Sequence, residues 1–107
     1  VLMRQYNLLQ NYNMHITNKG LAEFIELCLQ CQDIKALTAL FDLFLTEEEK
    51  SDMALRCLLI QELLKQELPQ REIAKKLNIS IAKVTRGSNE LKRIDNKLLK
   101  FLQNNLL

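Results

Sequence analysis

The sequence predicts an all-α fold of six helices, and two observations support this prediction. Only 2 of the 107 residues are Gly and 1 is Pro, so the chain lacks the turn residues that a β-sandwich needs. Apolar residues make up 48% of the chain, and they recur mainly at the three- and four-residue spacing of helices. A chain of this length suits one domain. We expect that domain over residues 18–107, after an Asn-rich, flexible arm over residues 1–17.

The first two helices are marked by apolar stripes. The first stripe consists of Leu21, Phe24, Ile25, Cys28 and Leu29, and it predicts a helix over residues 18–32. Asp33 is a suitable N-cap for a second, shorter helix, whose apolar residues are Ile34, Leu37, Leu40, Phe41 and Phe44. Cys28 and Cys31 form a single C-x-x-C without a second pair of metal ligands. We interpret them, with Cys57, as buried reduced thiols rather than as a metal site.

The third predicted helix is apolar on nearly every side. Thr46 and the three Glu residues after it form a capping box, which predicts a helix over residues 47–66. Residues 53–60 are apolar apart from Arg56. A helix apolar on all sides must be buried on all sides, and 107 residues are too few to surround it, so we expect a partner chain. Arg56 either extends from the shoulder of the helix to solvent or places a charge at the wall of a ligand site.

Two short helices and a final helix follow. Pro69 is predicted at the first position of a helix that continues over residues 70–77. Asn78 and Ile79 form a tight turn, because Asn tolerates the left-handed conformation. Ser80 is the expected cap of the next helix, residues 81–89, and the last helix begins after Asp95.

Residues 70–89 have the residue chemistry of a helix-turn-helix. Ile73, Leu77, Ile79, Ile81 and Val84 fall where two crossed helices touch each other and the body, and Ala74 is small where the helices come closest. Arg71, Lys75, Lys76, Lys83 and Arg86 lie between them and are predicted to face outward. The alternative is an ordinary helical hairpin.

In a helix-turn-helix the second helix enters the major groove. The residues expected to contact DNA are Gln70, Arg71, Ile81, Ala82, Lys83, Thr85, Ser88 and Lys92. Arg71 would contact either a guanine or a phosphate.

Charge is distributed unevenly along the chain. Residues 65–100 contain ten basic and four acidic side chains, whereas the remainder contains five basic and nine acidic ones. A basic region in a chain of net charge +2 is typical of a surface that faces DNA. Without a signal peptide or an apolar run of roughly 18 residues, we expect a soluble, cytoplasmic protein.

The segment V-T-R-G-S-N-E-L-K, from Val84 to Lys92, resembles a hallmark of the bacterial Trp repressor family, together with Q-R-E at residues 70–72. Gly87 stands where a hydrophobic residue would be usual. The resemblance continues through L-T-x-x-E at residues 45–49 and E-L-L at residues 62–64, so it covers residues 43–92 without a gap. It extends more loosely over the first two helices.

The resemblance implies an intertwined homodimer that represses genes of tryptophan biosynthesis or uptake. It would bind palindromic double-stranded operator DNA with L-tryptophan as corepressor, without a metal or other cofactor. Arg56 and Arg86 would stack on the two faces of the indole from different subunits, and Arg86 would pair with the ligand carboxylate, as planar guanidinium groups do well. The other implied ligand contacts are Gly87, which leaves room for the ring, Ile60, which lines the pocket, and the backbone carbonyls of Leu43, Leu45 and Thr46.

The sequence also departs from the family. Glu90 stands where the best-known members carry Ser, near the ligand ammonium, so it would either strengthen ammonium binding or repel operator phosphates. Lys83 replaces a familiar Thr, which predicts a different base preference. Pro69 replaces a Ser cap, and residues 78–80 replace a Gly-rich turn, which predicts a stiffer turn.

Three other functions are alternatives to this interpretation. A regulator of the same fold could answer a different small molecule or none. An intertwined helical dimer could serve as a scaffold and would then lack salt-dependent DNA binding. An enzyme is the weakest alternative, because the sequence offers no nucleophile–base set, no catalytic carboxylate pair and no Gly-rich phosphate loop.

Overall fold

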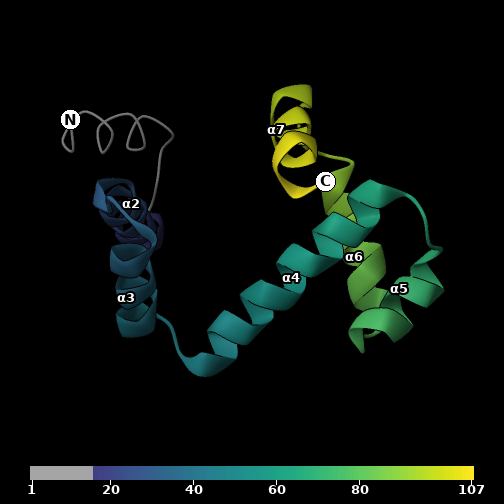
Figure 1. Ribbon diagram of the computed structural model, residues 1–107, viewed down its shortest axis with the longest axis horizontal. Coiled ribbons are helices and arrows are strands. Elements are labelled where there is room, and N and C mark those ends of the chain that lie inside the picture. The colour runs from purple at the N-terminus through teal and green to yellow at the C-terminus, as the bar shows by residue number, and fades with distance from the viewer. Residues whose placement is uncertain (1–15) are drawn as a thin grey trace. The chain divides into compact units, whose positions relative to one another are not determined.

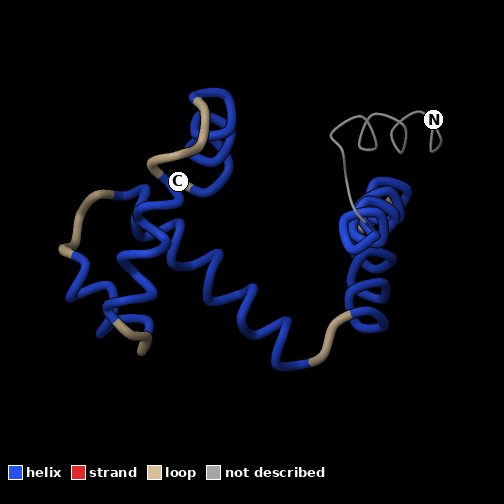
Figure 2. The backbone as a smooth tube through the Cα atoms, turned by 180° about the vertical axis from the view of Figure 1, so that it is seen from behind, coloured by secondary structure: helices blue, strands red, loops and turns tan. Residues whose placement is uncertain are grey.

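The computed structural model describes residues 16–107, and every regular element in that range is a helix (Figures 1 and 2). The elements are α2 (Ile16–Gln30), α3 (Ile34–Phe44), α4 (Glu47–Lys65), α5 (Gln70–Leu77), α6 (Ile81–Leu91) and α7 (Asn96–Leu106). The predicted all-α class with six helices is therefore confirmed for this part of the chain. No helix within it is both long and apolar enough to span a bilayer. Contacts divide the chain into two units between Thr46 and Glu47, and each unit is described by itself.

Helix boundaries differ from the predicted ones by at most two residues. α2 begins at Ile16 and ends at Gln30, two residues earlier than expected at each end. Ile16 and Thr17, which were predicted to end the arm, are therefore helical. The rest of the predicted arm lies outside the described residues and stays a prediction. α6 continues to Leu91, past the predicted end at residue 89. Pro69 is not the first helical residue as predicted: its ψ of 157° is extended, and it is the N-cap of α5.

The side-chain caps predicted at Asp33 and Ser80 are confirmed, and Asp95 likewise caps the helix that was expected to begin after it. Asp33 Oδ1 accepts a hydrogen bond of 2.8 Å from the backbone N–H of Ala36. Ser80 Oγ accepts one of 3.1 Å from Lys83 N–H, and Asp95 Oδ1 accepts one of 2.8 Å from Leu98 N–H. Each bond satisfies a backbone donor that has no partner within its own helix. Short polar side chains therefore set the starts of α3, α6 and α7.

In the N-terminal unit, aromatic side chains join α2 to α3. The ring of Phe24 lies 5.7 Å from that of Phe41 and 5.2 Å from that of Phe44, between centroids, in tilted arrangements. Ala22 and Glu26 are buried on one face of α2. Neither carboxylate oxygen of Glu26 has a hydrogen-bond partner among the described residues. Many large apolar side chains stay exposed on these two helices, namely Leu21, Ile25, Leu27, Leu29, Ile34, Leu43 and Phe44.

The core of the C-terminal unit lies where α5 and α6 pack on the later half of α4 (Figure 1). It consists of Leu59, Ile73, Ala74 and Val84, with Leu63, Leu77 and Ile79 packed around it. The predicted core positions of α5 and the turn are thus confirmed. Ile81 is a correction: it is 51% exposed, because it is the first residue of α6 and projects beyond the contact between the helices.

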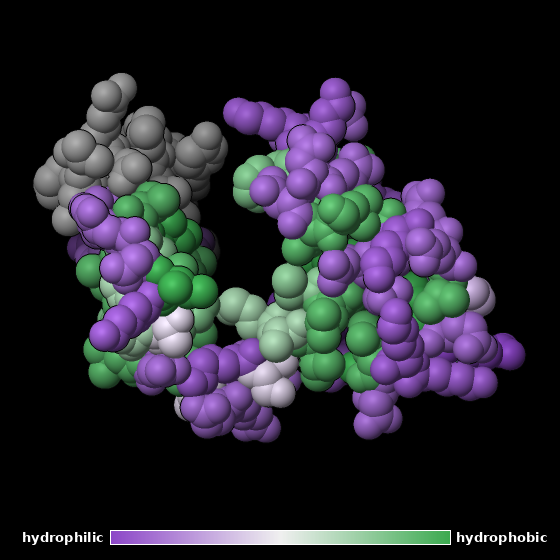
Figure 3. All heavy atoms as spheres, viewed as in Figure 1, coloured by the Kyte–Doolittle hydropathy of each residue, from purple (hydrophilic) through white to green (hydrophobic). Residues whose placement is uncertain are grey.

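Within the C-terminal unit, the middle of α4 is not buried on every side, and the partner chain expected to cover it stays a prediction. Met53 is 52% exposed and Leu58 46% exposed, because α5 and α6 pack against the face that carries Leu59 and Leu63. Cys57 is exposed, so the buried thiol expected there is wrong for the single chain, while Cys28 and Cys31 are half-buried. Figure 3 shows apolar side chains at the surface of each unit.

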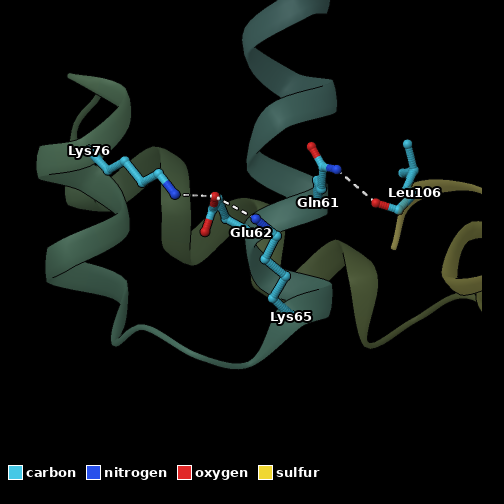
Figure 4. Close-up of polar contacts among 5 residues, drawn as sticks. All are labelled: Gln61, Glu62, Lys65, Lys76 and Leu106. Carbon is cyan, nitrogen blue, oxygen red and sulfur yellow. Dashed lines mark hydrogen bonds and ion pairs between the residues drawn. The ribbon is translucent and has the colours of Figure 1, made fainter.

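A buried carboxylate on α4 forms a hydrogen bond to α5 (Figure 4). The side chain of Glu62 is only 8% exposed. Its Oε1 accepts hydrogen bonds from Lys76 Nζ on α5 at 2.6 Å and from Lys65 Nζ on α4 at 3.3 Å. Lys76 is exposed, as predicted, with 51% of its side chain accessible, while its ammonium group contacts Glu62. On the same turn of α4, Gln61 Nε2 donates to the carbonyl of Leu106 at 2.7 Å, which ties the end of α7 to α4.

Gly87 allows α6 to approach α4 closely. A Cβ at this position would lie 2.9 Å from Leu59 Cδ2 and 3.5 Å from Leu63 Cδ1. The first distance is shorter than real Cβ contacts allow, and Leu59 is itself buried in the core. The structure therefore gives this glycine a packing reason within the single chain, independent of any ligand.

We predict that Glu62 makes the stability of the protein sensitive to acid. The hydrogen bond from Lys76, supported by Lys65, holds the pKa of Glu62 below its ordinary value of 4.5, although burial opposes this. A lowered folded-state pKa contributes stability that is present above pH 4.5 and is lost as the pH falls through the folded-state pKa. Denaturant unfolding of wild type and Glu62→Gln between pH 3 and 7, at one protein concentration, should show wild type more stable at pH 7 and the difference shrinking below pH 4.5. Glu90→Gln, an exposed control, should keep the wild-type pH dependence, and a constant difference for Glu62→Gln would contradict the assignment.

We also predict that a side chain at position 87 destabilises the fold. Gly87→Val should lower the free energy of unfolding by about 1–3 kcal/mol, because the added methyl groups overpack the contact with Leu59. Asn89→Val, on an exposed part of the same helix, should change it little, because Asn and Val have similar helix propensities. Equal effects of the two substitutions would show that α6 can move away from α4 at little cost.

Candidate nucleic-acid interface and ligand residues

The turn between α5 and α6 has the geometry of a helix-turn-helix. Asn78 ends α5 with φ 54° and ψ 49°, in the left-handed region, as predicted. The backbone N–H of Ile79 donates to the carbonyl of Ala74 at 3.0 Å and closes the turn. Ala74 is buried there, so its small side chain lets the two helices meet. The tight turn and the Ser80 cap place the first turn of α6 directly beside α5.

α6 buries one residue of its first turn and exposes the others. Val84 is fully buried against the core. Ile81, Ala82, Lys83 and Thr85 are exposed. These four are among the residues predicted to face DNA, and the structure leaves them all open to solvent. An α-helix with this exposed N-terminal part fits the major groove.

A hydrogen bond joins two of the predicted DNA-contacting residues across the motif. Thr85 Oγ1 on α6 donates to Gln70 Oε1 on α5 at 2.8 Å, and both groups are at the surface. The amide nitrogen of Gln70 then remains available as a donor. Sequence reasoning placed both residues near DNA but not in contact, because a pair 15 positions apart leaves no periodic signal.

The basic side chains of this unit divide into free and paired groups. Among the described residues, no ion-pair partner is found for Arg71, Lys83, Arg86 and Lys92. In contrast, Lys76 is held by Glu62 at 2.6 Å. Lys75 lies 3.9 Å from Glu72, and both side chains are largely exposed, so this pair is weak. The four named cations belong to α5, α6 and the residue after α6, where contacts to phosphate would need them.

An open depression lies between α5 and the start of α6. It is lined by Arg71, Ala74, Lys75, Asn78, Ile79, Ser80 and Ile81. Two basic side chains and the N-terminal end of α6 therefore border the same hollow. Cations and a helix N-terminus both attract anions, so the depression suits a phosphate group of bound DNA.

The residues predicted to bind the ligand occupy both units. Arg56 and Ile60 lie on α4, exposed and half-buried respectively, while Arg86 and Gly87 lie on α6, exposed and half-buried. Glu90 is exposed, and its Oε1 is 3.4 Å from Arg93 Nη1.

Three predicted ligand contacts belong to the N-terminal unit. Leu43 is 79% exposed on α3. Leu45 is the C-cap of that helix, with its N–H bonded to the carbonyl of Phe41, and Thr46 follows it. The ligand roles of all eight residues, like the DNA contacts, stay predictions.

The chain is similar to members of one protein family. The family model described as Trp repressor protein matches residues 19–106. A Trp operon repressor homolog from Chlamydia caviae is 49% identical over 85 residues, which cover 79% of this chain and 84% of the relative. The homolog from Chlamydia trachomatis serovar D is 49% identical over 84 residues, 78% of this chain and 89% of the relative. The homolog from Vibrio campbellii is 38% identical over 74 residues, 69% and 74% of the two chains.

The match of the family model spans all the helices from α2 to α7 almost completely. The predicted resemblance is thereby confirmed over a longer part of the chain than the motif alone covered. An enzymatic function is excluded by the same match, because the family consists of DNA-binding regulators. The chain belongs to the Trp repressor family of transcriptional regulators.

Proposed function

We propose that this chain acts as a homodimeric repressor that binds palindromic operator DNA when it carries L-tryptophan. The observation that carries the proposal is the exposed first turn of α6, which is fixed by the Ser80 cap and flanked by unpaired cations. The relatives named Trp operon repressor homolog support tryptophan as the effector. The regulated genes would be those of tryptophan biosynthesis or uptake, and the protein would act in the cytoplasm.

The DNA contacts follow from the exposure of each side chain. Ile81, Ala82 and Lys83 would meet base edges in the major groove, because they occupy the exposed start of α6. Thr85 and Lys92, together with the half-buried Gln70 and Ser88, would bind the phosphates on either side. Arg71 would contact either a guanine or a phosphate. In a two-fold dimer, two such units fit successive major grooves when they lie about 34–36 Å apart.

A second copy of the chain would cover the exposed apolar surface. α4 exposes Met53 and Leu58, and α7 exposes Leu98 and Phe101. Apolar side chains in such numbers are unusual on a soluble monomer. Since α4 was expected to be surrounded on all sides, its uncovered face is the natural contact for the partner subunit.

The ligand would act on the packing of α6 against α4. Gly87 touches Leu59 of α4, and α4 also carries Arg56 and Ile60. A ligand held by Arg56 and Arg86 would therefore contact both α4 and α6. α6 is the helix proposed to enter the major groove. If it favours the DNA-competent arrangement by about 1–3 kcal/mol, operator affinity rises by roughly 5- to 150-fold, and operator must tighten ligand binding by the same factor.

Calorimetric titration with L-tryptophan tests the proposal first. We expect one ligand per chain, two per dimer, and sedimentation should show a dimer.

Arg56→Ala should remove the heat of binding and the ligand response while weak non-specific DNA binding remains. Arg56 is exposed and has no structural partner among the described residues. Matched Lys97→Ala, on exposed α7, should titrate like wild type. Absence of heat up to millimolar ligand would favour a regulator of the same fold with another effector or none, and equal loss of non-specific binding in Arg56→Ala would contradict the role of this residue.

We predict that Lys83 influences base preference. It is exposed, unpaired among the described residues and in the first turn of α6. Selection of duplexes from a random pool by wild type and Lys83→Thr should yield different preferred bases, with a discrimination of about 1–3 kcal/mol at the affected position. An identical preference, with a salt dependence reduced by about 0.9 per lost contact, would instead make Lys83 a phosphate contact.

A further inference from the structure

The basic residues of α5 do not all face the same surroundings. Arg71 and Lys75 are one helical turn apart and both line the open depression beside α6. Lys76 is the next residue, about 100° further around the helix axis. Its Nζ lies 2.6 Å from Glu62 Oε1 (Figure 4), toward α4. One basic helix thus presents two cations to the depression, while a third, whose side chain stays 51% exposed, pairs with a buried carboxylate of its own unit.

The acceptor of this third cation is unusual. The Glu62 side chain is 8% exposed, whereas the other paired acids near the motif, Glu72 and Glu90, are 49% and 67% exposed. A hydrogen bond to a buried charge is stronger than a surface ion pair, because less water competes for it. The contact therefore restrains α5 on α4, in contrast to the two surface pairs.

We propose that Glu62 and Lys76 are positioning residues that set the tilt of the helix-turn-helix on α4, and that Lys76 makes no contact with DNA. The proposal rests on the proposed function, since it concerns how the motif meets its operator. α6 must follow α5, because the two helices share the core around Ile73 and Val84 and the Gln70–Thr85 hydrogen bond. A restraint on α5 is therefore also a restraint on α6, the helix proposed to enter the major groove.

The apolar core gives this tilt no directional restraint. It meets α5 through Ile73, Ala74 and Leu77, and apolar packing has no preferred direction. The Glu62–Lys76 pair adds a directional contact near the end of α5, one helical turn from Ile73. Such a contact favours one orientation among those that the apolar packing allows.

A double-mutant cycle on DNA binding tests the pair. The variants are Glu62→Gln, Lys76→Met and both together, measured on a duplex that wild type selects from a random pool. Neither single change strands a buried charge, because Glu62 keeps Lys65 at 3.3 Å and Gln is neutral. We expect each single variant and the double variant to bind about 5-fold more weakly than wild type. The salt dependence of binding should stay at the wild-type value in all three.

Lys75→Met provides the matched control on the same helix. Its effect on affinity should add to that of Glu62→Gln, because Lys75 has no contact with Glu62 and independent sites add. Additive effects of Glu62→Gln and Lys76→Met would overturn the proposal. So would a salt slope lowered by about 0.9 per lost contact in Lys76→Met, because that loss identifies a phosphate contact.

Hydrogen exchange of the free protein separates this proposal from the proposed function. Amides of residues 73–77 should exchange faster in Glu62→Gln and in Lys76→Met than in wild type, and no faster in the double variant than in either one. Wild-type exchange in both single variants would overturn the positioning role. If wild type shows no salt-dependent duplex binding, the proposed function fails, and the exchange data alone then decide whether the pair holds α5.

Discussion

The packing of α5 and α6 on the later half of α4 is the constraint on which the rest of the C-terminal unit depends. Leu59 lies at its centre, in contact with the core residues of both short helices and within reach of any side chain at position 87. Helices of 8 and 11 residues are too short to be stable alone in water. They are stable because α4 buries their apolar faces, so α4, α5 and α6 form one unit.

Electrostatics refines this arrangement rather than holding it together. The buried Glu62 pairs with Lys76, whose side chain stays 51% exposed, while Arg71, Lys83, Arg86 and Lys92 have no ion pair among the described residues. A uniformly basic surface would attract DNA in many orientations, because phosphate contacts carry no sequence information. Pairing one cation while leaving the others unpaired would limit the directions from which a duplex can approach.

Gly87 has two explanations, one from the implied ligand and one from helix packing. The family resemblance assigns it to the space of the indole, and the structure gives it a close contact with Leu59 in the single chain. Both explanations need the absence of a Cβ, and both concern the distance between α4 and α6. A ligand bound beside this contact would meet two helices that leave no room for a Cβ at position 87, and a close-packed interior transmits such strain.

The sequence by itself determined the elements and the family. Periodic apolar residues, the caps at Asp33, Ser80 and Asp95, and the left-handed Asn78 are local signals, readable because each acts within a few neighbouring positions. The V-T-R-G-S-N-E-L-K segment identified the family for the same reason. Only the tertiary structure decided the Glu62–Lys76 and Gln70–Thr85 contacts, the exposure of Ile81 and Cys57, and the approach of Gly87 to Leu59. The contacts join residues 14 to 28 positions apart, so they depend on how helices cross, which no local pattern of side chains specifies.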